Sequence, residues 1–299
     1  MNESPPHVQT KREIEQLLAA RGLRPRKRFG QHFLVDGNLM RTLVARAEIV
    51  STDCILEVGA GTGALTELLA QRAGRVVAVE IDRDLLIILR ERFAGVNNVT
   101  FVEGDVLAAK HSLSAEVIAA LARRSEHVGV TKLVANLPYQ VATPLVMNLL
   151  LDHPVVTQLC FTVQAEVGER ITADPGSKAF GPLSILAQLL CRTTTVARLG
   201  PQVFWPRPTV DSVMLCLDVG HCPFAGRGEL RAFAAFVREV FEYRRKTLRS
   251  ALRRVIGEDG IDRLENTFDL SRRAEQVGID EWLALAQSAG VCGVKPNGA

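Results

Sequence analysis

The sequence comprises 299 residues, 47% of them hydrophobic, with a net charge of +3. This length supports one large domain and a smaller one with a core. No apolar run reaches the roughly 18 residues of a membrane span, and the N-terminus lacks the apolar core of a signal peptide, so we expect a cytoplasmic protein. The six cysteines show no CxxC spacing. A zinc site or a disulfide framework is therefore not expected, and a reducing compartment fits.

The N-terminal part of the chain is basic, with seven Lys or Arg against three Asp or Glu in residues 1–28. A capping-box spacing that begins at Thr10 predicts a helix through Ala20. Residues 24–34 then combine basic side chains with two phenylalanines. Such an arm suits a place between a phosphate backbone and a ligand pocket, although a basic linker with a hydrophobic anchor would look the same. A helix over residues 38–49 follows.

Three closely spaced glycines mark the main candidate ligand-binding loop of the chain. An apolar run over residues 54–58 has the length of a strand buried on both faces. Gly59, Gly61 and Gly63 follow it, ahead of a helix expected over residues 64–71. Glycine lets the backbone turn sharply and lets a ligand approach with no Cβ in the way. The pattern is typical of a nucleotide-type ligand site on an open α/β sheet.

Two further strands are expected to end in acidic residues. The apolar run over residues 75–81 ends near Glu80, which lies 21 residues beyond the first glycine of the loop. An acidic residue at this place normally accepts hydrogen bonds from ribose hydroxyls. A helix over 84–93 and a strand over 99–102 come next, and Asp105 follows that strand. Both carboxylates are therefore expected at the ligand-binding edge of the sheet.

The rest of the chain changes from β to helical character. After a polar excursion (106–131) with a helix over 115–124, strands are expected over residues 132–135, 158–163, 192–199 and 210–219. Three prolines between the last two strands exclude a helix there and indicate a rigid loop. Helices are expected over residues 230–256, 261–268, 271–277 and 279–289. The predicted organisation is an N-terminal extension (1–23), an α/β domain (24–221) and a small all-helical domain (222–299).

The glycine spacing separates two classes of nucleotide ligand. A dinucleotide oxidoreductase requires G-x-G-x-x-G, with the helix terminus holding a pyrophosphate. Here the spacing is Gly59-x-Gly61-x-Gly63, and Glu57 lies two residues before it. A carboxylate beside the loop stabilises a cation and repels a pyrophosphate. The loop therefore favours S-adenosylmethionine, whose methionine part carries an ammonium, over a nicotinamide cofactor.

The four residues 136–139 indicate which group accepts the methyl. The exocyclic amine of a purine is a poor nucleophile because its lone pair is delocalised into the ring. Hydrogen bonds from that amine to the Asn136 side chain and the Leu137 carbonyl would favour a pyramidal nitrogen. Tyr139 would then stack on a base that has been unstacked from its nucleic acid. The alternative is an Asn-Pro turn with a core tyrosine.

Six motifs together resemble the universal small-subunit rRNA adenine N6-dimethyltransferases. They lie at residues 28–34, 57–63, 136–139, 176–183, 204–212 and 244–249. The resemblance implies a Rossmann-like class I S-adenosylmethionine methyltransferase sheet with a small all-helical C-terminal domain. It also implies transfer of two methyl groups to each of two adjacent adenines near the 3′ end of small-subunit rRNA, in an assembling 30S-type particle and without a metal.

The resemblance also implies roles for individual residues. Those implied to bind the cofactor are His32, Leu34, Gly59, Gly61, Glu80, Asp105 and Asn136. Those implied to act on the target adenine are Asn136, Leu137, Pro138, Tyr139 and Phe204, with the two aromatic rings on either side of the base. RNA contacts are expected from Arg26, Lys27, Arg28, Arg238, Arg245, Lys246 and Arg249.

The C-terminal basic residues are expected on one long helix, since residues 230–256 carry eight Lys or Arg and two Asp or Glu. Phosphate contacts position an RNA without reading its sequence, so specificity would come from the shape of the particle. Two alternatives stay open. One is the sister group that methylates large-subunit rRNA and confers macrolide resistance, and the other is a non-catalytic assembly factor. Nothing in the sequence requires more than a monomer.

Overall fold

The computed structural model describes residues 8–109, 112–123, 129–153 and 155–293. The chain divides into two compact units. The first comprises Met1–Leu149, His153–Gly168 and Thr194–Asp218, and the second comprises Leu150–Asp152, Glu169–Thr193 and Val219–Ala299. The second unit therefore takes in residues 150–152, 169–193 and 219–221, which the sequence-based division assigned to the α/β domain.

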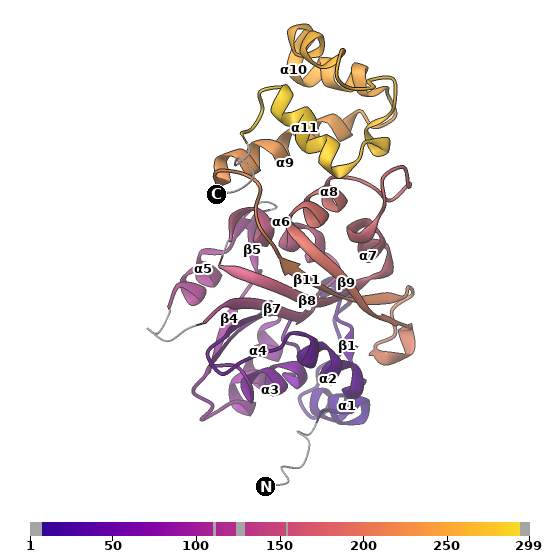
Figure 1. The fold of residues 1–299 in the computed structure, drawn as a ribbon. Helices are drawn as coiled ribbons and strands as arrows, with labels where there is room; N and C mark the ends of the chain where they lie inside the picture. The colour runs from indigo at the N-terminus through magenta and orange to yellow at the C-terminus, as the bar shows by residue number, and fades with distance from the viewer. Residues whose placement is uncertain (1–7, 110–111, 124–128, 154, 294–299) are drawn as a thin grey trace. The chain divides into compact units, whose positions relative to one another are not determined.

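A seven-stranded sheet forms the centre of the first unit (Figure 1). Its strands are β2 (Cys54–Val58), β3 (Arg75–Glu80), β4 (Val99–Glu103), β7 (Thr131–Asn136), β8 (Val156–Gln164), β9 (Cys191–Leu199) and β11 (Ser212–Val219). Their order is β4-β3-β2-β7-β8-β11-β9. Strands β4, β3, β2, β7 and β8 are parallel, and β11 runs antiparallel to β8. Each predicted strand of the sheet is present, and the α/β class is confirmed.

Helices cover both faces of this sheet. They are α1 (Lys11–Ala19), α2 (Gly37–Arg46), α3 (Ala64–Ala70), α4 (Arg83–Arg92), α5 (Ala115–Ala122) and α6 (Ala142–Asp152). Helices α2, α3 and α4 lie on one face, and α5 and α6 lie on the other (Figure 1). The predicted capping box of α1 is present, and Asp36 and Asp82 cap α2 and α4. The excursion before β7 contains a short hairpin, β5 (Leu107–Ala109) and β6 (Ser112–Leu113).

The strand order places a ligand-binding crevice beside β2. The chain passes from β2 to β3 and β4 on one side, and β7 then pairs with the other side of β2. Open α/β sheets bind ligands at such a switch point, outside the carboxyl ends of the strands. Strand β2 is buried at all five positions, as expected for a parallel strand covered on both faces. The glycine loop and Asn136 thus emerge side by side.

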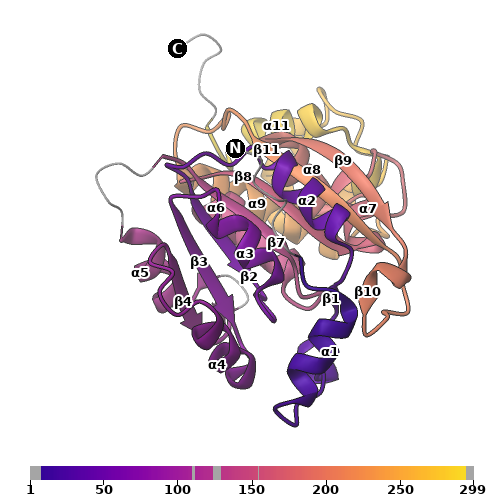
Figure 2. The same cartoon turned by 90° about the horizontal axis from the view of Figure 1, so that it is seen from below.

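The basic arm forms one wall of this region. After a 3-10 turn (Lys27–Phe29), strand β1 (Phe33–Leu34) pairs antiparallel with β10 (Phe204–Trp205), as Figure 2 shows. The proline-rich connection therefore contains a short strand as well as a 3-10 turn (Pro201–Val203), where the sequence predicted only a rigid loop. Ile14 and Leu18 of α1 pack in one cluster with Phe33, so the N-terminal helix contacts and stabilises the arm.

The remaining helices are α7 (Ala165–Thr172), α8 (Pro182–Leu190), α9 (Arg227–Glu242), α10 (Leu248–Leu264) and α11 (Ile279–Ser288), with a 3-10 turn over Ala274–Gln276. Three of the four predicted C-terminal helices differ from the structure. The separate helix predicted over residues 261–268 is wrong, because residues 261–264 are the end of α10, which is interrupted at Gly257 and stops at Leu264. The single helix predicted over residues 230–256 is wrong: Thr247 caps a new helix by accepting from the Ser250 amide. The predicted helix over 271–277 is also wrong, because that segment turns back and Arg273 forms a bridge with Thr247. Arg244, Arg245 and Lys246 therefore lie in the turn between α9 and α10, and Arg249 lies in the first turn of α10.

Two cysteines are joined in the sheet. Cys160 on β8 and Cys216 on β11 form a disulfide, at directly opposed positions of the two strands. The spacing of the cysteines in the sequence predicted no disulfide framework, because linear spacing does not reveal which residues of two strands are paired. None of the described helices is long and apolar enough to cross a bilayer.

Candidate active site

A cavity of about 120 Å³ opens at the carboxyl ends of β2, β3 and β7, entirely within the first unit. Its walls come from the arm, the glycine loop, the ends of β3 and β4, and the segment after β7. Of the predicted site residues it contains His32, Gly59, Gly61, Glu80, Asp105, Asn136, Leu137, Pro138 and Tyr139. Leu34 lines a smaller cavity that shares Gly59, Gly61 and Asn136 with the first. The predicted cofactor residues are thus brought together.

The glycine loop lies too close to its neighbours to carry side chains. Gly59 has a φ of +79°, and a Cβ there would come within 2.9 Å of Cγ of Pro138. Gly61 has a φ of +61°, and a Cβ there would come within 3.0 Å of the ring of Phe33. Both conditions favour glycine. The loop therefore presents bare backbone to the cavity and packs directly on the arm and the acceptor motif.

Glu80 is held at the cavity wall by backbone donors. Its carboxylate accepts from the amides of Gly61 at 2.8 Å and of Asp82 at 2.9 Å, and the residue is 4% exposed. Burial raises the pKa of Glu80 to about 7. A carboxylate has about four lone-pair sites, so acceptor capacity remains for a hydroxyl group. Ile81 follows it with 41% exposure and supplies an apolar surface beside the acid.

Glu57 lies beneath the loop rather than on the wall of the larger cavity. It is 1% exposed, lines the smaller cavity and accepts from the Thr66 hydroxyl at 2.6 Å. Burial raises the pKa of Glu57 to about 8, and the hydrogen bond from Thr66 opposes that shift. Two buried acidic side chains therefore lie next to the glycine loop, and both have pKa values near neutral pH.

The amide of Asn136 is fixed in one orientation. Its Nδ2 donates to the backbone carbonyl of His32 at 2.9 Å, and its Oδ1 accepts from the hydroxyl of Thr162. A carbonyl can only accept, so this pair of partners determines which end of the amide is which. Oδ1 retains a second lone pair for another donor. Thr162 was not identified from the sequence, where a threonine inside an apolar strand carries no signal of this role.

The aromatic residues of the site are arranged around Tyr139. The ring of His32 stacks on it with centroids 5.5 Å apart and an interplanar angle of 27°. His32 Nδ1 donates to the carbonyl of Pro206 at 2.7 Å, and the Tyr139 hydroxyl lies 3.0 Å from that of Ser212. Burial raises the pKa of the Tyr139 phenol. The proline-rich segment thus fixes the ring of His32 through Pro206, and Ser212, the first residue of β11, fixes the ring of Tyr139. Ser212 lies in the motif at residues 204–212, where no role was predicted for it.

Phe204 differs from its predicted role. It is 2% exposed, and its ring packs in the main core cluster with Leu34 and Met40. In this conformation it presents no face to a base, because its place in β10 turns the side chain into the core. Asp105, by contrast, is exposed at the cavity rim and accepts from the Leu107 amide at 2.9 Å.

The predicted RNA-binding residues fall into two sets. Lys27 and Arg28 are exposed on the arm, whereas Arg26 is half-buried and forms ion pairs with Asp82 and Asp84. The others belong to the second unit, and all are exposed: Arg238, Arg245, Lys246 and Arg249. Arg249 also pairs with Glu265. Among the residues that the structure describes, no three His, Cys, Asp or Glu are grouped so as to hold a metal ion.

The fold and the site define a class I methyltransferase: a mostly parallel seven-stranded sheet with a glycine loop and an acidic residue after the second strand. The model of the ribosomal RNA adenine dimethylase family matches residues 22–289. The ribosomal RNA small subunit methyltransferase A of Moorella thermoacetica is 39% identical over 91% of this chain and 95% of its own length. The same-named protein of Magnetococcus marinus is 38% identical, over 92% and 94%.

A solved structure agrees in fold. That of a dimethyladenosine transferase from Plasmodium falciparum superposes with a TM-score of 0.72 at 24% identity, over 87% of this chain and 99% of its own. The chain belongs to the ribosomal RNA adenine dimethylase family.

The Thr162 hydroxyl offers a test of how the amide is held. Thr162→Val keeps the shape of this buried residue and removes the donor to Asn136 Oδ1. We expect kcat for methyl transfer to fall about tenfold with little change in cofactor affinity, because the amide loses one of its two anchors. Steady-state kinetics on the intact protein measures both. An unchanged kcat would show that the His32 carbonyl alone orients the amide.

Proposed function

We propose that this protein uses S-adenosylmethionine to dimethylate N6 of two adjacent adenines near the 3′ end of small-subunit rRNA, within an assembling 30S-type particle. The observation that carries the proposal is the fixed amide of Asn136, which lies at the cavity wall beside Tyr139 with an acceptor lone pair to spare. The names of its relatives specify the small subunit. We propose further that the protein acts in the cytoplasm and as a monomer.

The residues of the cavity suit this cofactor. Glu80 would accept from its ribose hydroxyls, and Asp105 would accept from its adenine amine. The backbone of Gly59 and Gly61 would contact its methionine part directly, because neither residue carries a side chain that would keep the ligand away. The exposed side chain of Ile81 would cover the adenine. When bound, the cofactor supplies an electrophilic methyl group on a sulfonium.

The chain's own residues would prepare the target amine. Asn136 Oδ1 and the Leu137 carbonyl would accept its two hydrogens, which favours a pyramidal nitrogen with a localised lone pair. Asn136 Oδ1 keeps its direction during the reaction because Thr162 and the His32 carbonyl hold the amide from both ends. Tyr139 would stack on the flipped adenine, and Ser212 fixes that ring through its hydroxyl. His32 occupies one face of Tyr139, so the base would use the other face or displace the imidazole.

Docking on rRNA would use the exposed basic residues. On the arm these are Lys27 and Arg28, next to the cavity wall. In the helical C-terminal part, residues 222–299, they are Arg238, Arg245, Lys246 and Arg249. Contacts of this kind neutralise phosphates, so binding to the particle would weaken steeply with added salt.

A methyl-transfer assay tests the proposal. The purified protein is mixed with radiolabelled S-adenosylmethionine and with small subunits that lack the modification, with large subunits as the control. N6,N6-dimethyladenosine from the small subunit alone is the expected product. Label in the large subunit would assign the protein to the macrolide-resistance type. No label, from folded protein that still binds the particle, would make it an assembly factor without this activity.

Cofactor binding should depend on pH through the two buried acids. Their pKa values of about 8 for Glu57 and about 7 for Glu80 mean that both are partly protonated at neutral pH. A cationic ligand favours the ionised form, so it lowers both pKa values and releases protons. We expect affinity to rise between about pH 6 and 8. Calorimetry in buffers of different ionisation enthalpy measures the released protons, and heats that do not depend on the buffer would contradict the prediction.

A further inference from the structure

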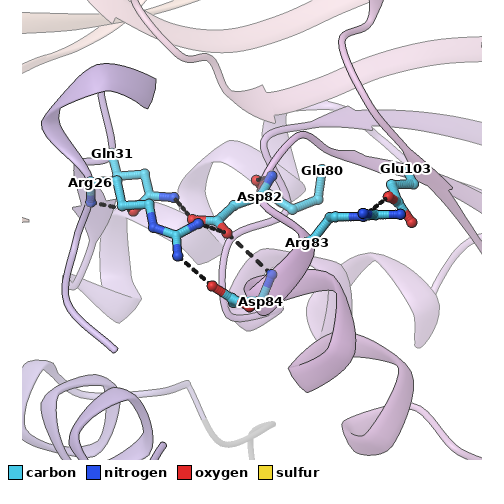
Figure 3. A network of polar contacts seen from close by, with 7 residues as sticks. All are labelled: Arg26, Gln31, Glu80, Asp82, Arg83, Asp84 and Glu103. Atoms are coloured by element: carbon cyan, nitrogen blue, oxygen red, sulfur yellow. Dashed lines mark hydrogen bonds and ion pairs between the residues drawn. The ribbon is translucent and has the colours of Figure 1, made fainter. Parts of the chain in front are cut away.

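The arm is tied to the cofactor-binding wall by a compact set of polar contacts (Figure 3). Arg26 Nη1 donates to Asp82 Oδ1 at 2.7 Å, and Nη2 donates to Asp84. The amide of Gln31 donates to the second oxygen of Asp82 at 2.9 Å. The arm also closes on itself, because the backbone amide of Arg26 donates to the side-chain carbonyl of Gln31 at 2.7 Å. We call Arg26, Gln31, Asp82 and Asp84 the latch.

The latch acts on a residue that is not free to move. Asp82 is 3% exposed, and its carboxylate also caps helix α4. Its backbone amide donates to Glu80 at 2.9 Å, so the segment that accepts the arm is the segment that orients the ribose acceptor. A charge buried at this depth requires a paired cation and hydrogen bonds. Arg26 supplies the cation, and Gln31 supplies the second hydrogen bond.

The latch joins two segments that line one cavity. Residues 29–33 of the arm line it, and so do Glu80 and Ile81. Beyond the latch, the arm is anchored at Phe33 and Leu34 by pairing with β10. Residues 26–31 lie ahead of that anchor and form a 3-10 turn that ends at Gly30, with a φ of +60°. Apolar residues on both sides of this portion, Leu23 and Phe33, pack with Leu85 and Ile88 of α4. The side-chain contacts to Asp82 and Asp84 are the polar ties of residues 26–31 themselves to the cofactor side.

We infer that Arg26, Gln31 and Asp82 are positioning residues that hold the arm closed against the ribose side of the cofactor cavity, so that cofactor affinity depends on the latch. This inference rests on the proposed function for the identity of the cofactor. A cofactor whose site is complete only when the arm is closed has an apparent affinity reduced by the fraction of closed protein. The methyl-transfer step itself, at saturating cofactor, does not involve these side chains.

The same geometry assigns Arg26 a role other than RNA contact. Its guanidinium is directed to two carboxylates, whereas its neighbours Lys27 and Arg28 are exposed.

The test uses the full-length protein, S-adenosylmethionine as the probe, and calorimetry followed by kinetics on small subunits. Arg26→Met is expected to raise Kd and the cofactor KM about tenfold and to leave kcat within about twofold. The Kd of Arg26→Lys should lie between those of the wild type and Arg26→Met, because lysine keeps the charge but lacks the planar guanidinium that reaches both carboxylates. The matched control is Arg21→Met, which removes an exposed pair with Glu91 and should leave Kd unchanged.

A second variant separates the latch from general destabilisation. Asp82→Asn retains a capping oxygen for α4 and loses the ion pair with Arg26. It should raise Kd as Arg26→Met does, and the double variant should lose clearly less affinity than the sum of the two single losses, because both single variants remove the Arg26–Asp82 contact. Additive losses would overturn the latch, as would a normal Kd in Arg26→Met or a fall in kcat at constant KM. A wild-type protein that fails to bind S-adenosylmethionine would overturn the proposed function itself. The inference about the latch, which depends on that cofactor, would then fall with it.

Discussion

Asn136→Ala is expected to reduce kcat for methyl transfer by about 10²–10³-fold, from a protein that still folds and still binds cofactor. The change removes the acceptor for the target amine at a site where the acceptor is pre-oriented by Thr162 and by the His32 carbonyl. An alanine leaves those two groups in place and provides no substitute. Single-turnover transfer to small subunits, with cofactor binding measured separately, resolves the chemical step from affinity.

A structural asparagine provides the matched control. Asn98 donates to the carbonyls of Ala70 and Ala73, away from the cavity, so Asn98→Ala removes a comparable amide without touching the acceptor site. It should lower stability and leave kcat per folded molecule unchanged. Near-normal turnover in Asn136→Ala would refute the proposed activation of the amine.

Lys132→Met is expected to lower the free energy of unfolding by about 3–5 kcal/mol, the largest effect on stability that the structure predicts. Lys132 lies at the opposite end of β7 from Asn136, and its ammonium is bonded to Asp53 at 2.9 Å. It also donates to the carbonyls of Ala47 and Glu48, each at 2.9 Å. The substitution leaves Asp53, with a side chain 2% exposed, charged and without this cation. Urea unfolding followed by circular dichroism measures the change.

Two further variants test the cause. Lys11→Met removes an exposed pair with Glu15 on helix α1 and should cost less than about 0.5 kcal/mol. Adding Asp53→Asn to Lys132→Met should restore part of the stability, since it removes the stranded charge. If the two buried substitutions instead add, the loss comes from packing and not from the ion pair.

The sheet and the glycine loop could be predicted because their signals are local. A few neighbouring residues are enough to recognise an apolar run such as residues 54–58. The same holds for the glycines that follow it and for the acidic residue at the end of the next strand. Asn136 and Tyr139 were recognised in the same way, from the chemistry of adjacent side chains. The cap at Thr247 could also have been recognised from the sequence, but the helix predicted over residues 230–256 ran through it.

The features that were missed depend on residues far apart in the chain. The disulfide of Cys160 with Cys216 requires the register of β8 and β11. The burial of Phe204 follows from the pairing of β10 with β1, for which a two-residue strand gives no signal. The use of Arg26 as a partner of Asp82, 56 residues away, cannot be distinguished from a surface cation by composition alone.

The contact between His32 and Pro206 joins residues 174 positions apart. Contacts of such large sequence separation close long loops of chain, and they form slowly and late in folding compared with local ones. We therefore expect the arm to dock after the sheet has formed, which would make the cofactor cavity one of the last parts of the molecule to be completed. A newly made chain would acquire a stable sheet first and the capacity to bind its ligand afterwards.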